Sequence, residues 1–193
     1  MFTKALFVLP FAALTLIAAK GPPPAIEPAP PSIAAPADVV ANPANKLTLE
    51  LSNGGSVVVQ LRPDIAPKHV ERIQTLVRQG FYNGLSFHRV IPGFMAQGGD
   101  PKGTGEGGST LPDLKAEFSA LPFLRGTVAA ARTGDNVDSA NSQFFIVFIP
   151  NAALNGQYTI FGRVISGMDA VDKIAPGEPP AEPTKIVRAT LGG

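Results

Sequence analysis

The stretch that most constrains the fold is 87–100, which reads Phe-His-Arg-Val-Ile-Pro-Gly-Phe-Met-Ala-Gln-Gly-Gly-Asp. Two short apolar runs flank Pro92-Gly93, a pair typical of a turn because proline presets φ and glycine tolerates a positive φ. The period of two along a strand then places Met95 and Gln97 on one face of the second run. We therefore expect a β-hairpin at the centre of the chain.

Arg89 is unusual within this hairpin. An arginine in an otherwise apolar strand is costly to bury unless another group answers its charge. One explanation is a structural ion pair, with Asp100 as the candidate partner. The other is function, because Phe94, Met95 and Gln97 follow within eight residues and add an aromatic ring, a thioether and an amide.

The composition excludes several classes of function. The chain has 193 residues, is 45% hydrophobic and carries a net charge of +1, which gives no electrostatic case for binding nucleic acid or an anionic membrane. Cysteine is absent, so disulfides and thiolate metal sites are ruled out. His69 and His88 are too few for a zinc site of the usual ligand count. We expect no metal and no cofactor.

Met1–Ala19 is expected to be a signal peptide. Lys4 supplies a positive charge, and Ala5–Ala19 is an apolar run shorter than the roughly 20 residues that span a bilayer. Pro10 also disfavours a membrane helix. An uncleaved anchor is the alternative. The sequence thus predicts export to the periplasm, with no stable membrane insertion after cleavage.

Residues 20–45 are expected to form a disordered linker. Eight of the chain's 20 prolines fall in Gly21–Ala44, interleaved mainly with alanine. Proline disrupts helices and sheet ladders, so the segment should run as an extended tether. A ligand for a proline-binding groove is the other possibility for this segment.

The folded part, 46–193, begins with a strand signal. In 46–51 leucines alternate with polar residues, and 56–61 is apolar and β-branched. Asn53-Gly54-Gly55 between them predicts a hairpin.

A helix is expected next. Pro67 suits an early helical position, Gly80 suits the end, and apolar residues recur at helical spacing between them. His69, in the first turns, is expected to be a solvated surface residue. A shorter helix is expected at 167–174.

Further apolar runs predict additional strands, at 126–131, 143–149, 158–164 and 185–191. Many short strands separated by turn signals, together with two helices, predict a barrel or a sandwich. Periodicity alone does not choose between these two architectures.

The glycine-rich stretch 103–108 formally satisfies the pattern G-x-G-x-x-G of dinucleotide sites. That pattern needs a following helix whose N-terminus receives the pyrophosphate. Residues 109–112 start no apolar helical run, and Asp100 would repel phosphate. A flexible loop bordering the functional site is the preferred interpretation.

Stretch 87–100 resembles the signature of cyclophilin-type peptidyl-prolyl cis-trans isomerases. Two further blocks, 142–146 (Ser-Gln-Phe-Phe-Ile) and 161–164 (Phe-Gly-Arg-Val), resemble the same family in the same order. The resemblance covers residue 46 to the C-terminus. It implies a closed antiparallel β-barrel of eight strands capped by a helix at each end. It also implies an isomerase that acts on proline-containing polypeptides. With the signal peptide, the expected partners are unfolded or folding exported proteins, and we expect a monomer.

The implied chemistry needs neither a nucleophile nor a metal, because no covalent bond breaks when an X-Pro bond rotates. The twisted state loses amide conjugation and leaves a lone pair on the proline nitrogen. A fixed donor aimed at that nitrogen stabilises the transition state more than either ground state. The arginine guanidinium, always protonated and rigid, suits this task. An apolar pocket must hold the proline ring meanwhile.

The resemblance assigns roles to nine residues. Arg89 is implied to be the catalytic arginine, and Gln97 to bind the peptide backbone and help orient Arg89. Ala131 and Arg132 are implied to offer main-chain contacts. The remaining residues are implied to line or rim the proline pocket: Phe94, Met95, Phe145, Leu154 and Tyr158.

Two positions depart from the best-known members. Ala153 stands where they have a tryptophan, and Tyr158 where they have a pocket-rim histidine. Because the tryptophan matters mainly for cyclosporin-like macrocycles, we expect weak inhibition rather than lost catalysis. The alternative function is a non-catalytic proline-binding chaperone or scaffold. Arg89 and Gln97 favour the enzyme, since binding alone needs only an apolar pocket.

Overall fold

The computed structural model describes residues 32–192, so the predicted signal peptide and the first part of the linker lie outside the described residues. Within 32–192, no helix is both long and apolar enough to cross a membrane. The elements, in chain order, are α1 (Ala37–Ala41), η1 (Pro43–Asn45), β1 (Lys46–Leu51), β2 (Ser56–Leu61), α2 (Pro67–Arg78), β3 (Phe87–Ile91), β4 (Met95–Gly98), β5 (Thr127–Ala130), β6 (Phe144–Val147), η2 (Ala152–Leu154), β7 (Ile160–Ser166), α3 (Met168–Val171) and β8 (Ile186–Leu191).

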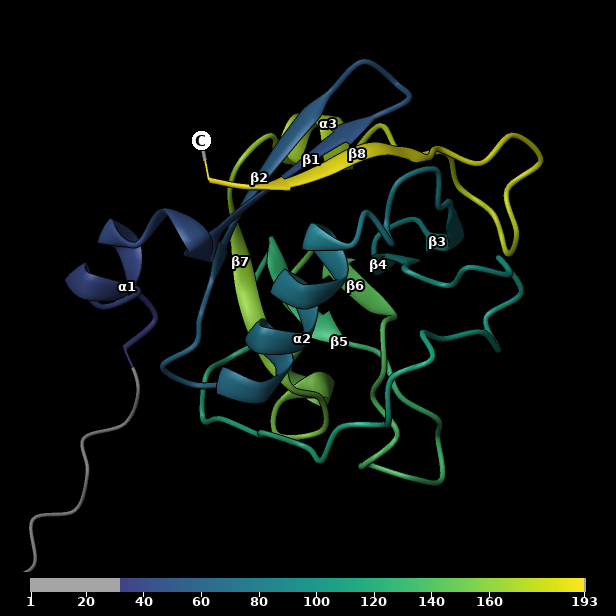
Figure 1. Ribbon diagram of the computed structural model, residues 1–193. Coiled ribbons are helices and arrows are strands. Elements are labelled where there is room, and N and C mark those ends of the chain that lie inside the picture. Colours follow the sequence, from purple (N-terminus) through teal and green to yellow (C-terminus); the bar gives the residue numbers. More distant parts are fainter. Residues whose placement is uncertain (1–31, 193) are drawn as a thin grey trace, which may run out of the picture.

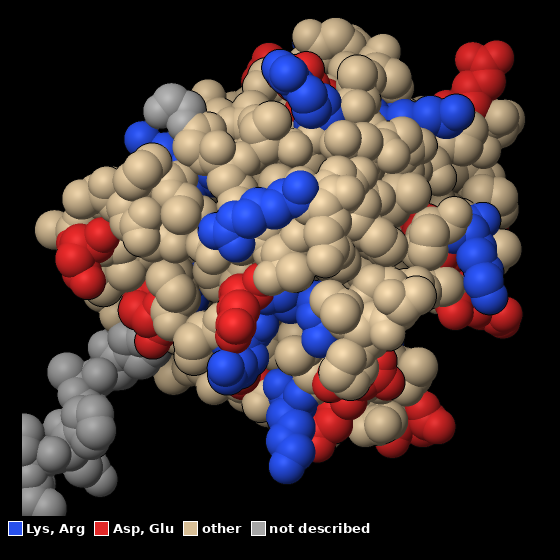
Figure 2. All heavy atoms as spheres, in the orientation of Figure 1, with Lys and Arg blue, Asp and Glu red and all other residues tan. Residues whose placement is uncertain are grey.

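The architecture is mainly β. Eight strands form one sheet in the order β3-β4-β6-β5-β7-β2-β1-β8, and all neighbouring pairs are antiparallel. Figure 1 shows β1, β2 and β8 together at the top of the view, with α2 in front of the lower strands. Positive and negative side chains are interspersed on the face drawn in Figure 2.

Both predicted hairpins are present. In the β1–β2 turn Gly54 has a φ of +82°, and the Leu51 amide donates to the Gly55 carbonyl. In the β3–β4 turn Gly93 has a φ of +72°, and the Phe94 amide donates to the Ile91 carbonyl at 3.0 Å. A positive φ at the third position of a turn that has proline at the second favours glycine strongly.

The prediction of a closed barrel was wrong, because the sheet is open between its terminal strands β3 and β8. Within residues 32–192, the free side of β3 is met by two isolated bridges, Ser86 to Lys185 and Val90 to Gly177. The segment along that side, 176–185, contains four prolines. Proline has no amide proton for a ladder, so β8 cannot extend backwards along β3.

The period of two along the strands separates two apolar clusters. One face of the central strands, with Val90, Ala96 and Ile146, belongs to the interior cluster, which also packs against α2. The opposite face carries the outer cluster, defined by Met95, Leu121, Phe123, Ala129, Phe145, Val147, Leu154 and Ile160. Residues that alternate along one strand therefore serve two separate cores.

Helix α2 confirms the predicted helix, and Gly80, with a φ of +68°, follows its end. The expectation for His69 was wrong, because its side chain is only 3% exposed. Its Nδ1 lies 2.6 Å from Oε2 of Glu117, which also accepts the His69 backbone amide. The long loop that carries Glu117 covers the start of the helix, which periodicity along the helix does not reveal.

The end of the predicted linker is also ordered. Residues 37–41 form α1 and 43–45 form η1, where disorder was expected through residue 45. Val39 is 6% exposed, and the Asn45 side chain donates to its carbonyl at 3.1 Å. One buried apolar side chain and its capping contacts thus order a stretch whose composition alone indicated disorder.

Candidate active site

The candidate site is built on a row of paired residues that crosses the sheet. Arg89 on β3 lies opposite Gln97 on β4, which lies opposite Phe145 on β6, which lies opposite Ala129 on β5. Directly opposed residues of antiparallel strands project to the same face. The register therefore places a guanidinium, an amide and an aromatic ring side by side on the face of the outer cluster.

A cavity of about 140 Å³ opens beside this row. The residues that line it are Arg89, Phe94, Met95, Gln97, Ala131, Arg132, Phe145, Leu154 and Tyr158. The structure thus brings together all nine residues that the sequence singled out. They come from β3, β4, β6, η2 and the connecting loops.

The apolar part of the cavity is fixed by packing. Met95, Phe145 and Leu154 are each at most 9% exposed. The ring of Phe145 stacks on Phe123 with centroids 6.1 Å apart and forms a T-shaped pair with Tyr158 at a centroid distance of 5.3 Å. Such aromatic pairs hold a ring orientation as well as burying area. The wall is therefore shaped before any ligand enters.

Arg89 forms an ion pair, but its partner is not Asp100. Nε of Arg89 donates to Oε2 of Glu178 at 2.6 Å, and the two side chains are 40% and 51% exposed. Sequence reasoning missed Glu178. It lies 89 residues away, in the proline-rich segment before β8, and no local pattern marks it. Because Glu178 takes Nε, the two terminal nitrogens of Arg89 remain available to the cavity.

Asp100 instead organises the glycine-rich loop. Its carboxylate accepts backbone amides of Lys102, Thr104 and Gly105 at 2.6–2.9 Å. Burial opposes ionisation, but these amide donors outweigh it and lower the pKa of Asp100. A Cβ at Gly107 would lie 1.9 Å from this carboxylate, so the loop needs glycine there. The loop amides already bind the Asp100 carboxylate, and the next element after the loop is strand β5 rather than a helix. The loop therefore lacks the arrangement that a dinucleotide site needs.

Gln97 does not hydrogen-bond to Arg89. Its Nε2 donates to Oε1 of Gln143 at 2.9 Å, and Gln143 donates in turn to the carbonyls of Gly105 and Gly107. This chain of amides joins the sheet to the glycine-rich loop. Gln143 belongs to a block that the sequence had marked, but its side-chain role was not foreseen.

Arg132 is held at the other side of the cavity. Its guanidinium carbon lies 4.8 Å from the centre of the Tyr158 ring, and Nε donates to the Gln157 carbonyl at 3.2 Å. Cations favour such positions over aromatic faces. Gln97, Ala131 and Arg132 also line a neighbouring cavity of about 380 Å³ under the glycine-rich loop. The site is therefore an extended groove with two connected depressions.

Among residues 32–192, no group of three or more His, Asp or Glu side chains is placed to hold a metal ion. His88, next to Arg89 in sequence, is buried, and neither ring nitrogen has a hydrogen-bond partner.

This combination of an antiparallel sheet, an apolar cavity and an arginine at its edge is the arrangement that the resemblance to cyclophilin-type isomerases implies. The family model described as "Cyclophilin type peptidyl-prolyl cis-trans isomerase/CLD" matches residues 46–191. The chain belongs to this family and is a peptidyl-prolyl cis-trans isomerase.

Curated relatives agree. A probable peptidyl-prolyl cis-trans isomerase of Brucella suis is 54% identical over 167 residues, covering 78% of this chain and 84% of the relative. Peptidyl-prolyl cis-trans isomerase B of Bacillus subtilis is 41% identical over 128 residues, covering 66% and 89%.

Two solved structures are similar as well. A cyclophilin from Hirschia baltica has a TM-score of 0.69 at 30% identity, covering 78% of this chain and 74% of its own. A cyclophilin-type isomerase from Cryptosporidium parvum, crystallised in the presence of the dipeptide Ala-Pro, has a TM-score of 0.71 at 27% identity, covering 77% and 99%.

Proposed function

We propose that this isomerase accelerates X-Pro rotation in exported proteins, with Arg89 as the catalytic residue and the cavity beside it as the proline site. The observation that carries the proposal is the row Arg89–Gln97–Phe145, which sets a permanent cation beside a pre-formed apolar cavity. When the peptide bond twists, the proline nitrogen gains a lone pair. A guanidinium beside the apolar cavity that holds the ring can donate a hydrogen bond to this nitrogen.

The energetic demand on the site is modest. Rotation about the peptide bond has a barrier of about 18–20 kcal/mol, and uncatalysed X-Pro isomerisation takes about 10–100 s. Reaching milliseconds, roughly four decades faster, requires lowering the barrier by roughly 5.5 kcal/mol. One charge-assisted hydrogen bond formed only in the twisted state, together with desolvation and a held ring, can supply this amount.

Each part of the cavity has a separate task in this mechanism. The buried wall of Met95, Phe145 and Leu154 holds the pyrrolidine ring, while the residue before proline rotates on the exposed side. Gln97, Ala131 and Arg132 lie where the substrate backbone would continue into the neighbouring depression. Arg89 then donates from a terminal nitrogen to the proline nitrogen as its amide conjugation is lost.

The export part of the proposal rests on residues 1–19, whose charge and apolar run are typical of a signal peptide. We propose a periplasmic location and a monomeric enzyme. Expression in a bacterial host, followed by fractionation and mass spectrometry of the recovered chain, tests this. A periplasmic product that starts near residue 20 is expected, and a cytoplasmic product that retains Met1 would contradict export.

The catalytic assignment is tested by exchange NMR on an Ala-Pro peptide with the full chain. Arg89→Ala is expected to accelerate exchange at least about a hundredfold less than the natural chain, because it removes the only charged donor of the proposed step. Arg188→Ala, which removes an exposed arginine paired with Glu50, is the matched control. It should keep full activity.

The same experiment distinguishes an isomerase from the alternative function, a non-catalytic proline-binding module. If neither the natural chain nor Arg89→Ala accelerates exchange, yet both bind the peptide, the site is a proline-binding module without turnover. If Arg89→Ala keeps full activity, the donor role assigned to Arg89 is wrong.

A further inference from the structure

The end of β2 carries two polar side chains that face away from the interior cluster. Val57, Val59 and Leu61 belong to that cluster, so the alternation of the strand directs Gln60 and Arg62 to the opposite face. Yet Gln60 and Arg62 are each only 4% exposed. Polar residues on the outer face of a sheet are buried only where another segment covers them.

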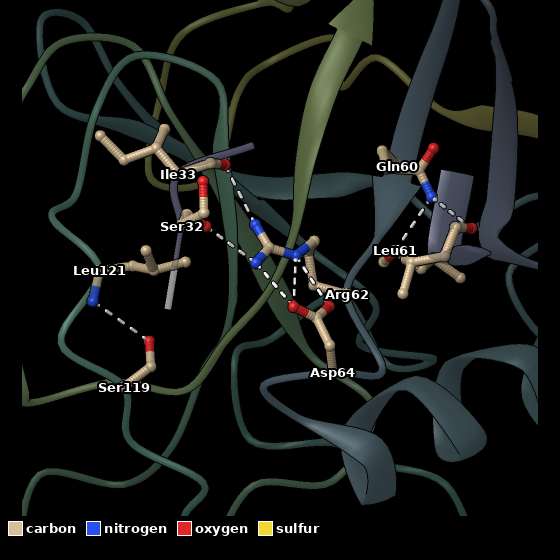
Figure 3. Close-up of polar contacts among 9 residues, drawn as sticks. Ser32, Ile33, Gln60, Leu61, Arg62, Asp64, Ser119 and Leu121 are labelled. Carbon is tan, nitrogen blue, oxygen red and sulfur yellow. Dashed lines mark hydrogen bonds and ion pairs between the residues drawn. The ribbon is translucent and has the colours of Figure 1, made fainter. Parts of the chain in front are cut away.

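The cover is the segment that precedes the domain. Arg62 binds Asp64 through Nε and Nη2, at 2.8 and 2.7 Å, so its charge is answered locally. Its other donors go to successive backbone carbonyls, Nη1 to Ile33 at 3.1 Å and Nη2 to Ser32 at 3.0 Å. Figure 3 shows the guanidinium lying between the Asp64 carboxylate and this pair of carbonyls.

Gln60 provides a second anchor. Its Nε2 lies 3.1 Å from the Asn45 carbonyl and 3.4 Å from the Val39 carbonyl. The Asn45 side chain donates to the same Val39 carbonyl, and the Val39 side chain is buried. Gln74 on α2 adds a contact to the Ala44 carbonyl at 2.9 Å. The segment is therefore held at both of its ends.

We propose that Arg62 and Gln60 form a docking site for the chain's own residues 32–45, which fixes the point where the preceding chain leaves the domain. A buried guanidinium needs acceptors for its donors, and Nη1 of Arg62 has the Ile33 carbonyl as its acceptor, so the burial of Arg62 depends on this segment. The region that matches the family begins at residue 46, so this docked segment lies outside the shared domain.

The chain's own segment is the favoured occupant for a geometric reason. Residue 45 is followed directly by β1, whose Lys46 pairs with Gln60 on β2. Residues 32–45 are thus tethered beside the site, which gives them a high effective concentration over any free peptide. Ile33 also lines a small cavity with Leu121 and Ile160, next to the outer cluster. The contacts use backbone carbonyls, so they need little from the segment's side chains.

Spin labelling tests the proposal in the full chain. Because the chain has no cysteine, Ser32→Cys supplies a single thiol for a nitroxide, and the Ser32 carbonyl that binds Arg62 is kept. A broad, immobilised spectrum is expected. Adding Arg62→Ala should give a narrow, mobile spectrum, whereas adding Arg188→Ala should leave it broad. A narrow spectrum in the Ser32→Cys parent, or a broad one with Arg62→Ala, would overturn the docking site.

A second variant acts from the segment side, so that the eight-stranded sheet is unchanged. Val39→Asp places a charge at the buried position of α1, which should weaken docking of the segment. Hydrogen-exchange rates of the Val40 and Asn45 amides should then rise at least about tenfold. Unchanged exchange would contradict docking. Isomerase activity should stay within about twofold in Arg62→Ala and Val39→Asp, because neither residue lines the proline cavity. If activity is retained, the outcome of the docking test does not depend on whether Arg89 has the proposed catalytic role.

Discussion

Glu178 accepts a hydrogen bond from Nε of Arg89 at 2.6 Å, and this contact couples the proline-rich segment before β8 to the edge of the candidate site. Both side chains are about half exposed, so the pair adds little to stability. Its geometry matters more than its energy. A guanidinium fixed through Nε directs its two terminal nitrogens as a unit.

Glu178→Ala is therefore expected to lower kcat/KM about two- to fivefold, by releasing the guanidinium from its orientation rather than by removing a donor. Glu178→Gln keeps an oxygen that can accept from Nε and should restore most of the activity. Exchange NMR on the same Ala-Pro peptide measures both variants. Equal losses in the two variants would show that charge, and not orientation, is the contribution of Glu178.

Gln143→Leu tests the amide chain that joins the sheet to the glycine-rich loop. The change leaves the Gly105 and Gly107 carbonyls and the Gln97 amide without their partner. We expect kcat/KM to fall about tenfold, since the loop borders the peptide groove and Gln97 loses its fixed orientation. Faster hydrogen exchange in 103–108 should accompany the loss.

Gln79→Leu, an exposed glutamine just after α2, is the matched control and should leave both the rate and the exchange unchanged. Loop exchange that rises in Gln143→Leu without any loss of activity would show that the loop is not needed for turnover.

Much of the site was predictable because it is encoded locally. The alternation in 87–100 and the turn at Pro92-Gly93 place Met95 and Gln97 on one face without tertiary information. The resemblance supplied the residues from other elements, and the strand register brings them around one cavity. Short-range patterns, together with the motifs that carry the resemblance, were thus enough to predict the residues that line the cavity.

The features that the sequence did not predict depend on contacts between distant segments. The Arg89–Glu178 pair, the cover over His69 and the contact of Gln60 with Val39 each join separate elements of the chain, and composition gives no signal for them. The open edge beside β3 was missed for a different reason. The closed barrel was implied by the resemblance, whereas prolines in 176–185 keep β8 from extending along β3.

Ala153→Trp tests the departure in the pocket rim. Ala153 is exposed within η2, directly before the cavity residue Leu154. Because the family's tryptophan here serves mainly to bind cyclosporin-like macrocycles, the substitution is expected to raise the affinity for cyclosporin at least about tenfold by adding a large apolar contact. Turnover of the Ala-Pro peptide should change little. Inhibition titrations of both proteins measure the effect. An unchanged affinity would show that Ala153 is not the cause of weak cyclosporin binding.

We expect the two buried histidines to make stability depend on pH near neutrality. Burial lowers the pKa of His69, although the hydrogen bond with Glu117 opposes the shift, and burial likewise lowers the pKa of His88. The geometry agrees, because Nε2 of His69 and both nitrogens of His88 are buried without partners and a proton added there would find no acceptor. In the folded protein both rings are therefore neutral near pH 7.

The sign of the effect follows from proton binding. The histidines of an unfolded chain have a pKa of about 6.5. Below that pH the unfolded chain therefore binds protons that the folded chain does not bind. Stability is full above that pH and falls as the pH drops below it, until the lowered pKa values of the folded state are reached. The slope is at most about 1.4 kcal/mol per pH unit for each histidine.

Urea unfolding between pH 7.5 and 5.5, a range above the titration of ordinary carboxylates, measures this slope. His69→Gln should remove the contribution of one histidine, and the double variant His69→Gln/His88→Gln should flatten the profile, since the chain contains no other histidine. Glutamine keeps a donor for Glu117 but cannot titrate, so any loss of stability at pH 7.5 is separate from the slope. A double variant as pH-dependent as the natural chain would show that the buried histidines are not the cause.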